Sequence, residues 1–230
     1  MNTDKRLTLF LGHYGSGKTN IAVNYAVRLA MEGKQVSIAD LDIVNPYFRT
    51  KDSADELDAL GIRLIFPRYA NTNVDLPALP AESYSLVQDR TRYGVMDIGG
   101  DDRGAYALGR FAEAIRSEDN YRVAFVVNCY RPLTSTVEDT VEIMREIEAA
   151  CGLEFTCIVN NSNLGPETTV RTVTDSFDFV ERLSRATGLE VWMHTAEERV
   201  ARELTGLDVM PLKLQKKFFD LPAGSPIGIA

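Results

Sequence analysis

Hydrophobic residues in this chain form short continuous runs, and longer amphipathic stretches separate these runs. The runs are rich in β-branched residues and apolar at nearly every position, a pattern typical of strands covered on both faces. The predicted strands are residues 7–11, 36–41, 63–66, 95–98, 123–128, 155–160 and 190–194.

The stretches between the runs include three with helical spacing of apolar residues. They predict helices over residues 18–31, 134–150 and 167–187. Ser135, with Glu138 three residues later, is typical of a capping box at the start of the second helix. Residues 68–89 are less regular, because Pro77 and Pro80 interrupt any helix there. We expect this segment to be a loop.

Strands that alternate with helices of this length indicate βαβ units. We therefore predict the α/β class, a three-layer domain with a mainly parallel sheet and helices on both faces. No internal repeat and no linker rich in Ser, Gly or Pro divides the 230 residues. The prediction is a single domain over residues 1–230, with 210–230 as a C-terminal tail.

Charge and composition narrow the classes of function. The 25 Lys and Arg against 33 Asp and Glu give a net charge of −8, which argues against a nucleic-acid binder. The three cysteines form no C-x-x-C pair, which disfavours a disulfide framework or a zinc site. The longest apolar runs are too short to span a membrane, and the first residues are polar. We expect a cytoplasmic protein that does not bind membranes.

Residues 12–19, Gly-His-Tyr-Gly-Ser-Gly-Lys-Thr, fit the phosphate-loop pattern G-x-x-x-x-G-K-[ST] at every fixed position. The loop follows a predicted strand and opens a predicted helix, as this motif requires. Its glycines let backbone N–H groups turn toward phosphate oxygens, and the helix N-terminus adds partial positive charge. The predicted nucleotide-binding residues here are Gly12, His13, Tyr14, Gly15, Ser16, Gly17, Lys18, Thr19 and Asn20. Lys18 would neutralise phosphate charge, and the Thr19 hydroxyl would ligate Mg²⁺.

A carboxylate for Mg²⁺ follows from the segment Val-Met-Asp-Ile-Gly-Gly at 95–100. Asp97 lies near the end of a predicted strand and would hold the ion, in part through water. The N–H groups of Gly99 or Gly100 could then contact the γ-phosphate. An Asp followed by glycines is also common in turns, so this segment alone does not indicate a metal site. It does so only in combination with the phosphate-loop pattern.

Two further acids end the second predicted strand, Asp40 and Asp42. They are two residues apart, so their side chains lean the same way. At the carboxyl edge of the sheet, where ligands bind in open α/β folds, they would face the phosphates. Asp42 is the predicted catalytic residue that orients the attacking water, with a share in the metal site. Asp40 is a candidate second partner of the metal, and a solvated strand end is the plain alternative.

These elements, GHYGSGKTNIAVNYA, DLDIVNPYFR and DIGGDDRGAYALGR in that order, resemble the MinD/ParA group of P-loop NTPases, the SIMIBI class. The resemblance covers the whole chain and is strongest to a poorly characterised bacterial branch. It implies that the acids after the second strand mark switch I and that Asp97 to Gly100 mark switch II. It also implies ATP and Mg²⁺ as cofactors.

Two features bear on this resemblance. The group usually has a signature lysine after the first glycine of the loop, where this chain has His13. In the group that lysine acts across an ATP-dependent dimer, so His13 puts this kind of dimer in doubt. A homodimer of another kind is still possible. No N-K-x-D motif of GTPases occurs. In adenine-binding members an Asn at the end of a late strand reads the base, and Asn160 matches that position, which favours ATP over GTP. A turn started by Asn160 and Asn161 is the alternative.

We therefore expect an ATPase that binds Mg·ATP and slowly hydrolyses it to ADP. This cycle would drive a change in conformation or in partner binding. One alternative is a metabolic kinase or ligase of the same fold, with a small-molecule co-substrate near residues 75–80 and Arg131. A further alternative is a nucleotide-binding adaptor that hydrolyses little. The expected partner is an unidentified protein or a small-molecule co-substrate.

Overall fold

The computed structural model describes residues 4–41, 54–65, 81–100 and 102–214. Its strands are β1 (Leu7–Leu11), β2 (Val36–Leu41), β3 (Arg63–Ile65), β4 (Tyr93–Ile98), β5 (Tyr121–Val127), β6 (Cys157–Asn160), β7 (Glu190–Glu197) and β8 (Val209–Leu212). Its α-helices are α1 (Lys18–Met31), α2 (Ala54–Ala59), α3 (Ala81–Gln88), α4 (Asp102–Gly109), α5 (Ala112–Arg116), α6 (Val137–Cys151), α7 (Val170–Thr187) and α8 (Glu198–Ala201). Two short 3₁₀ turns, η2 (Pro132–Thr134) and η3 (Gly165–Glu167), precede α6 and α7.

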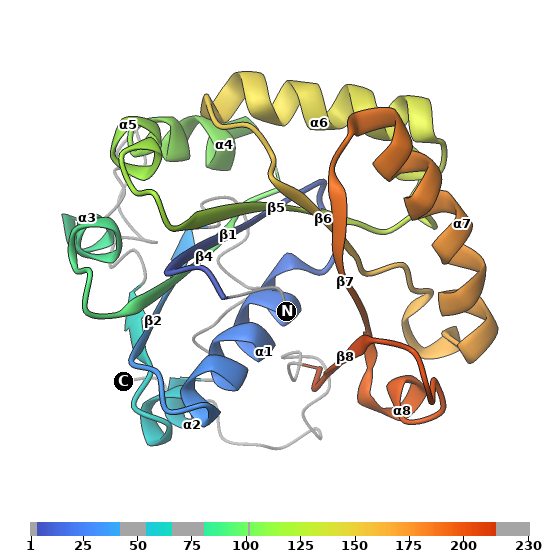
Figure 1. Cartoon of the computed structure of the whole chain (residues 1–230), viewed down its shortest axis with the longest axis horizontal. Coiled ribbons are helices and arrows are strands. Elements are labelled where there is room, and N and C mark those ends of the chain that lie inside the picture. The colour runs from blue at the N-terminus through green and yellow to red at the C-terminus, as the bar shows by residue number, and fades with distance from the viewer. Residues whose placement is uncertain (1–3, 42–53, 66–80, 101, 215–230) are drawn as a thin grey trace, which may run out of the picture.

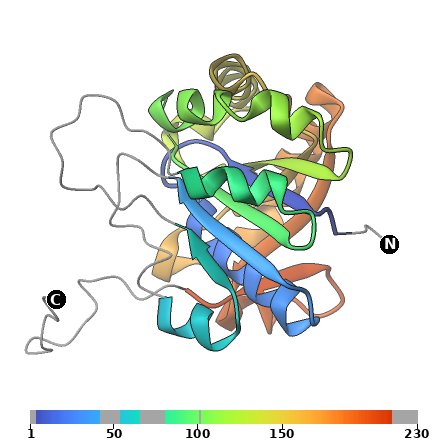
Figure 2. The same cartoon turned by 90° about the vertical axis from the view of Figure 1, so that its left-hand side faces the viewer.

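The strands form one eight-stranded sheet in the order β3-β2-β4-β1-β5-β6-β7-β8, and each described pair of neighbours is parallel. Helices cover both faces: α1 and α2 lie below the sheet in Figure 1, while α3 to α7 lie above and beside it. Figure 2 shows the same arrangement edge-on, with the helices in separate layers. The predicted α/β architecture is therefore confirmed. In a parallel sheet, the loops that follow the strands all meet at one edge.

The core is divided by the sheet into two parts, which explains why most strands are apolar on both sides. The larger part joins the sheet to α3–α7 through residues such as Phe111, Phe125 and Leu183. The other joins the sheet to α1 and α2 through residues such as Phe10, Tyr25 and Leu57. β1 is fully buried from end to end, so it provides a rigid base for the loop that follows it.

An aromatic cluster anchors β7 to α1. The Trp192 ring stacks on Phe10 at a centroid distance of 6.1 Å and meets Tyr25 edge-on at 5.3 Å. The Arg122 guanidinium lies 3.9 Å from the centre of the Trp192 ring, a cation–π contact. Trp192 thus serves the core, as its position within a strand suggests.

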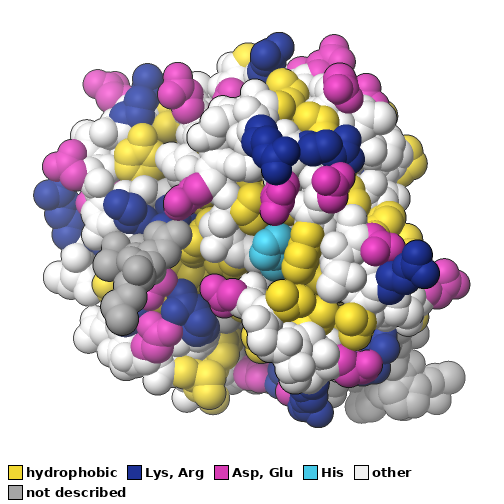
Figure 3. All heavy atoms as spheres, turned by 45° about the vertical axis from the view of Figure 1, so that its right-hand side comes forward, with side chains coloured by type: hydrophobic (Ala, Val, Ile, Leu, Met, Phe, Trp, Pro, Cys, Tyr) yellow, Lys and Arg dark blue, Asp and Glu magenta, His cyan; other side chains and the backbone are white. Residues whose placement is uncertain are grey.

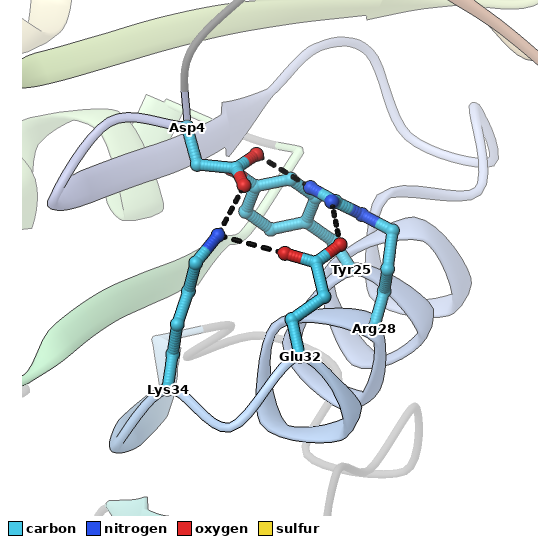
Figure 4. Close-up of polar contacts among 5 residues, drawn as sticks. All are labelled: Asp4, Tyr25, Arg28, Glu32 and Lys34. Atoms are coloured by element: carbon cyan, nitrogen blue, oxygen red, sulfur yellow. Dashed lines mark hydrogen bonds and ion pairs between the residues drawn. The ribbon is translucent and has the colours of Figure 1, made fainter.

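The far end of α1 is fastened to the N-terminal segment by charges (Figure 4). Asp4 forms an ion pair with Arg28, with 2.6 Å between its Oδ1 and the guanidinium nitrogen, and a second ion pair with Lys34. Burial alone would raise the pKa of Asp4, but these two cations hold that pKa below its ordinary value. Tyr25 lies beneath the group, and burial raises the pKa of its hydroxyl to about 12. The network orients α1, whose other end begins at the phosphate loop.

Several boundaries differ from those predicted. Residues 81–88 form α3 inside the segment expected to be a loop, and residues 66–80 lie outside the described residues. The predicted tail begins within the sheet, because 209–212 form strand β8, while 215–230 lie outside the described residues. None of the described helices is long and apolar enough to cross a membrane.

The right-hand side of the molecule, where α7, β7 and β8 lie in Figure 1, carries charges of both signs. Figure 3 shows basic and acidic side chains interspersed on this face. On α7 they form pairs one helical turn apart, including Arg182 with Asp178 at 3.0 Å and Arg185 with Glu181 at 2.9 Å. Such exposed pairs contribute little stability, at most about 0.5 kcal/mol each.

Candidate functional site

The loop of residues 12–17 joins β1 to α1 at the carboxyl edge of the sheet. Gly12 lies directly against β5: a Cβ atom there would be 2.3 Å from the carbonyl oxygen of Val126. Gly15 and Gly17 have φ angles of +77° and +91°, in the left-handed region that favours glycine. The three glycines of the predicted phosphate loop are therefore required by its path.

Hydrogen bonds hold the loop in a closed turn. Ser16 N and Lys18 Nζ both donate to the carbonyl oxygen of His13, each at 3.2 Å. Helix α1 begins after Gly17, and its first turn closes with Ile21 N donating to Gly17 O at 3.2 Å. The first N–H groups of a helix have no acceptor within the helix, and its dipole places positive potential there. The loop and helix start therefore suit a bound phosphate chain.

The side chains of the loop are mostly sheltered. Lys18 and Thr19 are each 7% exposed, and Asn20 is half-buried. Two buried polar atoms of the loop, His13 Nδ1 and Ser16 Oγ, have no hydrogen-bond partner among the described residues. Buried polar atoms are rarely left unsatisfied, so they fit a loop built to meet a polar ligand. Tyr14, by contrast, projects from the loop and is 57% exposed.

Asp97 lies beside the loop on the neighbouring strand β4. It is 1% exposed, and its register partners are Phe10 on β1 and Asp40 on β2. Phe10 contacts Tyr25 of α1 at a centroid distance of 5.6 Å, so this face of the sheet is the one that α1 covers. Side chains in register on parallel strands share a face. Asp97 and Asp40 therefore both lie on the side of the sheet where α1 begins.

The segment after Asp97 rests on the phosphate loop. A Cβ atom on Gly100 would be 2.7 Å from Lys18 Nζ and 2.7 Å from Tyr14 N. A Cβ atom on Gly104, at the start of α4, would be 2.9 Å from Gly99 O. Only glycines permit this approach of two backbones. The structure thus brings together three of the predicted components: the loop, Asp97 and the glycines at 99 and 100.

Some predicted components lie outside the described residues. Asp42 is one of them, and so is the segment 75–80 that was considered for a co-substrate. Asp40 is described and is 6% exposed within β2, one position before the strand's last residue. The catalytic role of Asp42 remains a prediction.

The two asparagines at the end of β6 point in different directions. Asn160 is 1% exposed, and its amide nitrogen contacts Ser176 Oγ at 2.8 Å and His194 Nδ1 at 3.0 Å. Its Oδ1 accepts from the backbone N and the hydroxyl of Ser162. Every polar atom of the Asn160 side chain is thus engaged between β6, α7 and β7. The side chain is committed to internal bonds.

Asn161 instead contacts the phosphate loop. Its Nδ2 donates to Ser16 O at 2.7 Å, and its Oδ1 accepts from Thr195 Oγ1 at 2.7 Å. A Cβ atom on Gly17 would be 2.2 Å from Asn161 Nδ2, so the amide lies directly against the loop. The sequence placed Asn161 in a turn and gave Thr195 no role. The sequence favoured Asn160 of this pair, whereas the structure brings Asn161 to the loop.

His194 lies on β7, next to Asn160. Its ring lies 4.1 Å from that of Phe177, and Nδ1 faces the amide of Asn160. Burial lowers the pKa of His194 below its ordinary value, although the charge of Asp208 opposes this. The neutral form with Nδ1 as acceptor fits the amide donor that faces it.

The turn after β5 supplies one more contact. Arg131 Nε donates to Gly15 O at 3.2 Å, and its guanidinium lies 3.3 Å from where a Cβ of Gly15 would be. The sequence suggested Arg131 for a co-substrate site but did not predict this bond. The loop carbonyls of Gly15 and Ser16 are therefore each held by a side chain from another strand end.

Solved structures of similar shape exist. They include the cell division protein FtsY from Thermotoga maritima, 15% identical, with a TM-score of 0.57 over 86% of this chain and 64% of that one. FtsY from Mycoplasma mycoides is 15% identical, with a TM-score of 0.52 over 83% of this chain and 60% of that one. The 54 kDa signal recognition particle protein from Aeropyrum pernix, in complex with GDP, is 15% identical, with a TM-score of 0.53 over 83% and 41%.

The chain has the fold of the P-loop NTPases. It spans less than two thirds of the length of each of these solved structures. No family model matches the sequence. No curated protein matches it either. The likeness concerns the fold, so the narrower resemblance to the MinD/ParA group stays a prediction.

Proposed function

We propose that this protein binds Mg·ATP at the loop of residues 12–19, hydrolyses it slowly, and uses the cycle to change conformation or partner binding. The observation that carries this proposal is the contact between Gly100 and the loop at Lys18 Nζ and Tyr14 N. The segment that follows the buried acid Asp97 is thereby built against the phosphate loop. A γ-phosphate bound between them would displace or hold that segment.

Each residue has a separate task in the proposed reaction. Lys18 turns from the His13 carbonyl, now 3.2 Å away, toward the phosphates and balances their charge. Thr19 and Asp97 would hold Mg²⁺, which would offset negative charge on the phosphates. Backbone N–H groups at the start of α1 and at Gly99 and Gly100 stabilise the transferring phosphoryl group. Asp42 orients the attacking water.

Adenine is the proposed base. Guanine presents two adjacent donors, N1–H and the 2-amino group, which one carboxylate can accept together. The described residues 160–164 carry amides, a serine and a leucine, and no carboxylate. Asn161 contacts the loop and so lies nearer the proposed nucleotide than Asn160, whose side chain bonds to α7 and β7. A guanine nucleotide is the second candidate, because the similar protein from Aeropyrum pernix was solved with GDP.

The proposed coupling runs through the residues after β4. Gly100 contacts the loop, and α4 begins two residues later. Helix α4 packs against α6, and Tyr106 on α4 is 67% exposed. A shift of Gly100 on nucleotide binding would therefore reach an exposed helix that a protein partner can contact. The partner or co-substrate remains to be identified.

The experiment is Mg²⁺-dependent phosphate release from ATP and from GTP, with direct binding measured beside it. Wild type is compared with Lys18→Ala and with the matched control Lys213→Ala, whose exposed ammonium pairs only with Glu56 among the described contacts. We expect release from ATP that is lost in Lys18→Ala, lost on chelation of Mg²⁺, and kept in Lys213→Ala.

Other results have definite meanings. Faster release from GTP would replace adenine with guanine as the base. Tight ATP binding without release would favour the adaptor or an enzyme that waits for its co-substrate. Binding of neither nucleotide would overturn the proposed function.

A further inference from the structure

The phosphate loop is held from outside by two side chains. Asn161 donates to Ser16 O at 2.7 Å, and Arg131 donates through Nε to Gly15 O at 3.2 Å. These carbonyls belong to consecutive peptide groups. The N–H and C=O of one peptide point in opposite directions. Ser16 N is bonded inside the loop to His13 O, so the Gly15 oxygen faces outward, where Arg131 meets it.

Each of these two peptides adjoins a glycine, which makes its rotation easier. Gly15 and Gly17 flank Ser16, and glycine permits backbone angles that other residues cannot adopt. Rotation of either peptide would turn a carbonyl oxygen toward the phosphate site and repel an anion there. A fixed donor on each oxygen prevents that rotation before the nucleotide arrives. Such preorganisation improves affinity, because less order must be imposed on binding.

The turn that carries Arg131 is itself rigidly built. Its hub is Asn128, which is 1% exposed. Asn128 Oδ1 accepts from Tyr130 N at 3.0 Å, and Asn128 O accepts from Thr134 Oγ1 at 2.7 Å. Asn128 Nδ2 donates to Asn163 O at 3.0 Å, which ties this turn to the one that carries Asn161. Arg131 is exposed, but its backbone is fixed by buried bonds.

We propose that Arg131 is a positioning residue of the nucleotide site, which holds the Gly15–Ser16 peptide of the phosphate loop with its oxygen outward. The inference rests on the proposed function, because it concerns the affinity of that same site. Arg131 acts through the loop and from its outer side. A charged donor suits this place, since hydrogen bonds from ionised groups are stronger than neutral ones.

The test uses the full chain and measures the dissociation constants of Mg·ADP and Mg·GDP by calorimetry. Arg131→Met keeps the length of the side chain and removes its donors, and Arg131→Lys restores one donor. Arg145→Ala, an exposed arginine on α6, is the matched control. We expect Arg131→Met to weaken binding of the preferred nucleotide by about tenfold, about 1.4 kcal/mol. Arg131→Lys should bind within about threefold of wild type, and Arg145→Ala should match wild type.

The thermal midpoint of the nucleotide-free protein separates positioning from plain structural support. We expect Arg131→Met to leave that midpoint unchanged. A lower midpoint that accompanies weaker binding would overturn the inference, as would a Lys variant no better than Met. Unchanged affinity in Arg131→Met, with wild type binding normally, would overturn this inference alone. Wild type that binds neither nucleotide would overturn the proposed function as well.

Discussion

At the scale of single residues, the glycines of this site are required by what lies next to them. Gly12 and Gly17 have positive φ angles, and a Cβ atom on either would lie within 2.3 Å of a neighbour, the Val126 oxygen or the Asn161 amide nitrogen. Gly100 differs, because contact alone excludes a side chain there. The sequence shows the two glycines after Asp97 and predicts that they contact the γ-phosphate. The contact of Gly100 with Lys18 and Tyr14, however, depends on how β4 and β1 are paired.

Gly100→Ala tests that contact. A methyl group would be 2.7 Å from Lys18 Nζ and from Tyr14 N, so the loop or the segment after β4 must move. We expect nucleotide affinity to fall by at least about tenfold, because displacement of the phosphate-binding groups costs binding energy. Calorimetric titration with Mg·ADP and Mg·GDP measures the effect.

Gly109→Ala is the control for this substitution, since a methyl group there meets its neighbours at 3.6 Å, an ordinary contact distance. It should bind nucleotide like wild type. Equal affinity in wild type and Gly100→Ala would show that Gly100 is not held against the loop in solution.

At the scale of elements, helix α6 shows how local signals can be ambiguous. The sequence favoured Ser135 and Glu138 as the capping box, but the N-cap of α6 is the next residue, Thr136. Thr136 accepts from Asp139 N at 3.1 Å and donates to Asp139 Oδ2 at 2.7 Å. Ser135 Oγ instead donates to Pro132 O at 3.0 Å, in the 3₁₀ turn before the helix. Both residues suit a cap, and the path of that turn selects Thr136.

The two residues should therefore differ on substitution. Thr136→Ala should lower the free energy of unfolding by about 1 kcal/mol, the usual cost of losing an N-cap. Ser135→Ala should change it by less than about 0.5 kcal/mol, as is usual at exposed positions. Urea denaturation measures both. A larger loss in Ser135→Ala would restore the boundary that the sequence favoured.

The long helices were predictable, and the shortest helices were not. The limits of α1, residues 18–31, agree with the prediction, because a full amphipathic face and a terminal glycine mark them. Helices α2, α5 and α8 have only four to six residues, too few for a period to be recognised. Strand β8 contains Pro211, which argues against a strand in sequence but is tolerated at the sheet edge.

At the scale of the whole molecule, Arg6 joins parts of the chain that are far apart in sequence. Its guanidinium donates to Leu86 O at 3.0 Å and to Val87 O at 3.2 Å, at the end of α3. It also forms a 2.9 Å ion pair with Glu118, and both side chains are 8% exposed. The buried Arg6 guanidinium thus binds the carbonyl groups at the C-terminal end of α3. It connects this helix to β1 and to the turn before β5.

Arg6→Met should lower the free energy of unfolding by about 3–5 kcal/mol, because it leaves the carbonyls at the end of α3 without their donor and the buried Glu118 carboxylate with only the exposed Arg90, at 3.5 Å. Glu118→Gln should cost less, about 1–2 kcal/mol, since the arginine keeps its carbonyl acceptors. Urea denaturation of both variants gives the comparison. A greater loss in Glu118→Gln would mean that the ion pair, and not the helix end, dominates this contact.

The sequence by itself determined the layered α/β fold, and it placed a glycine-rich loop between β1 and α1 and Asp97 with two glycines at the end of β4. These depend on local spacing and on the burial of continuous apolar runs, which a linear chain displays. Tertiary structure decided which of two adjacent asparagines contacts the loop and which arginine holds it. Those choices depend on the face of β6 and on the turn after β5, which are set only when strands far apart in sequence pair.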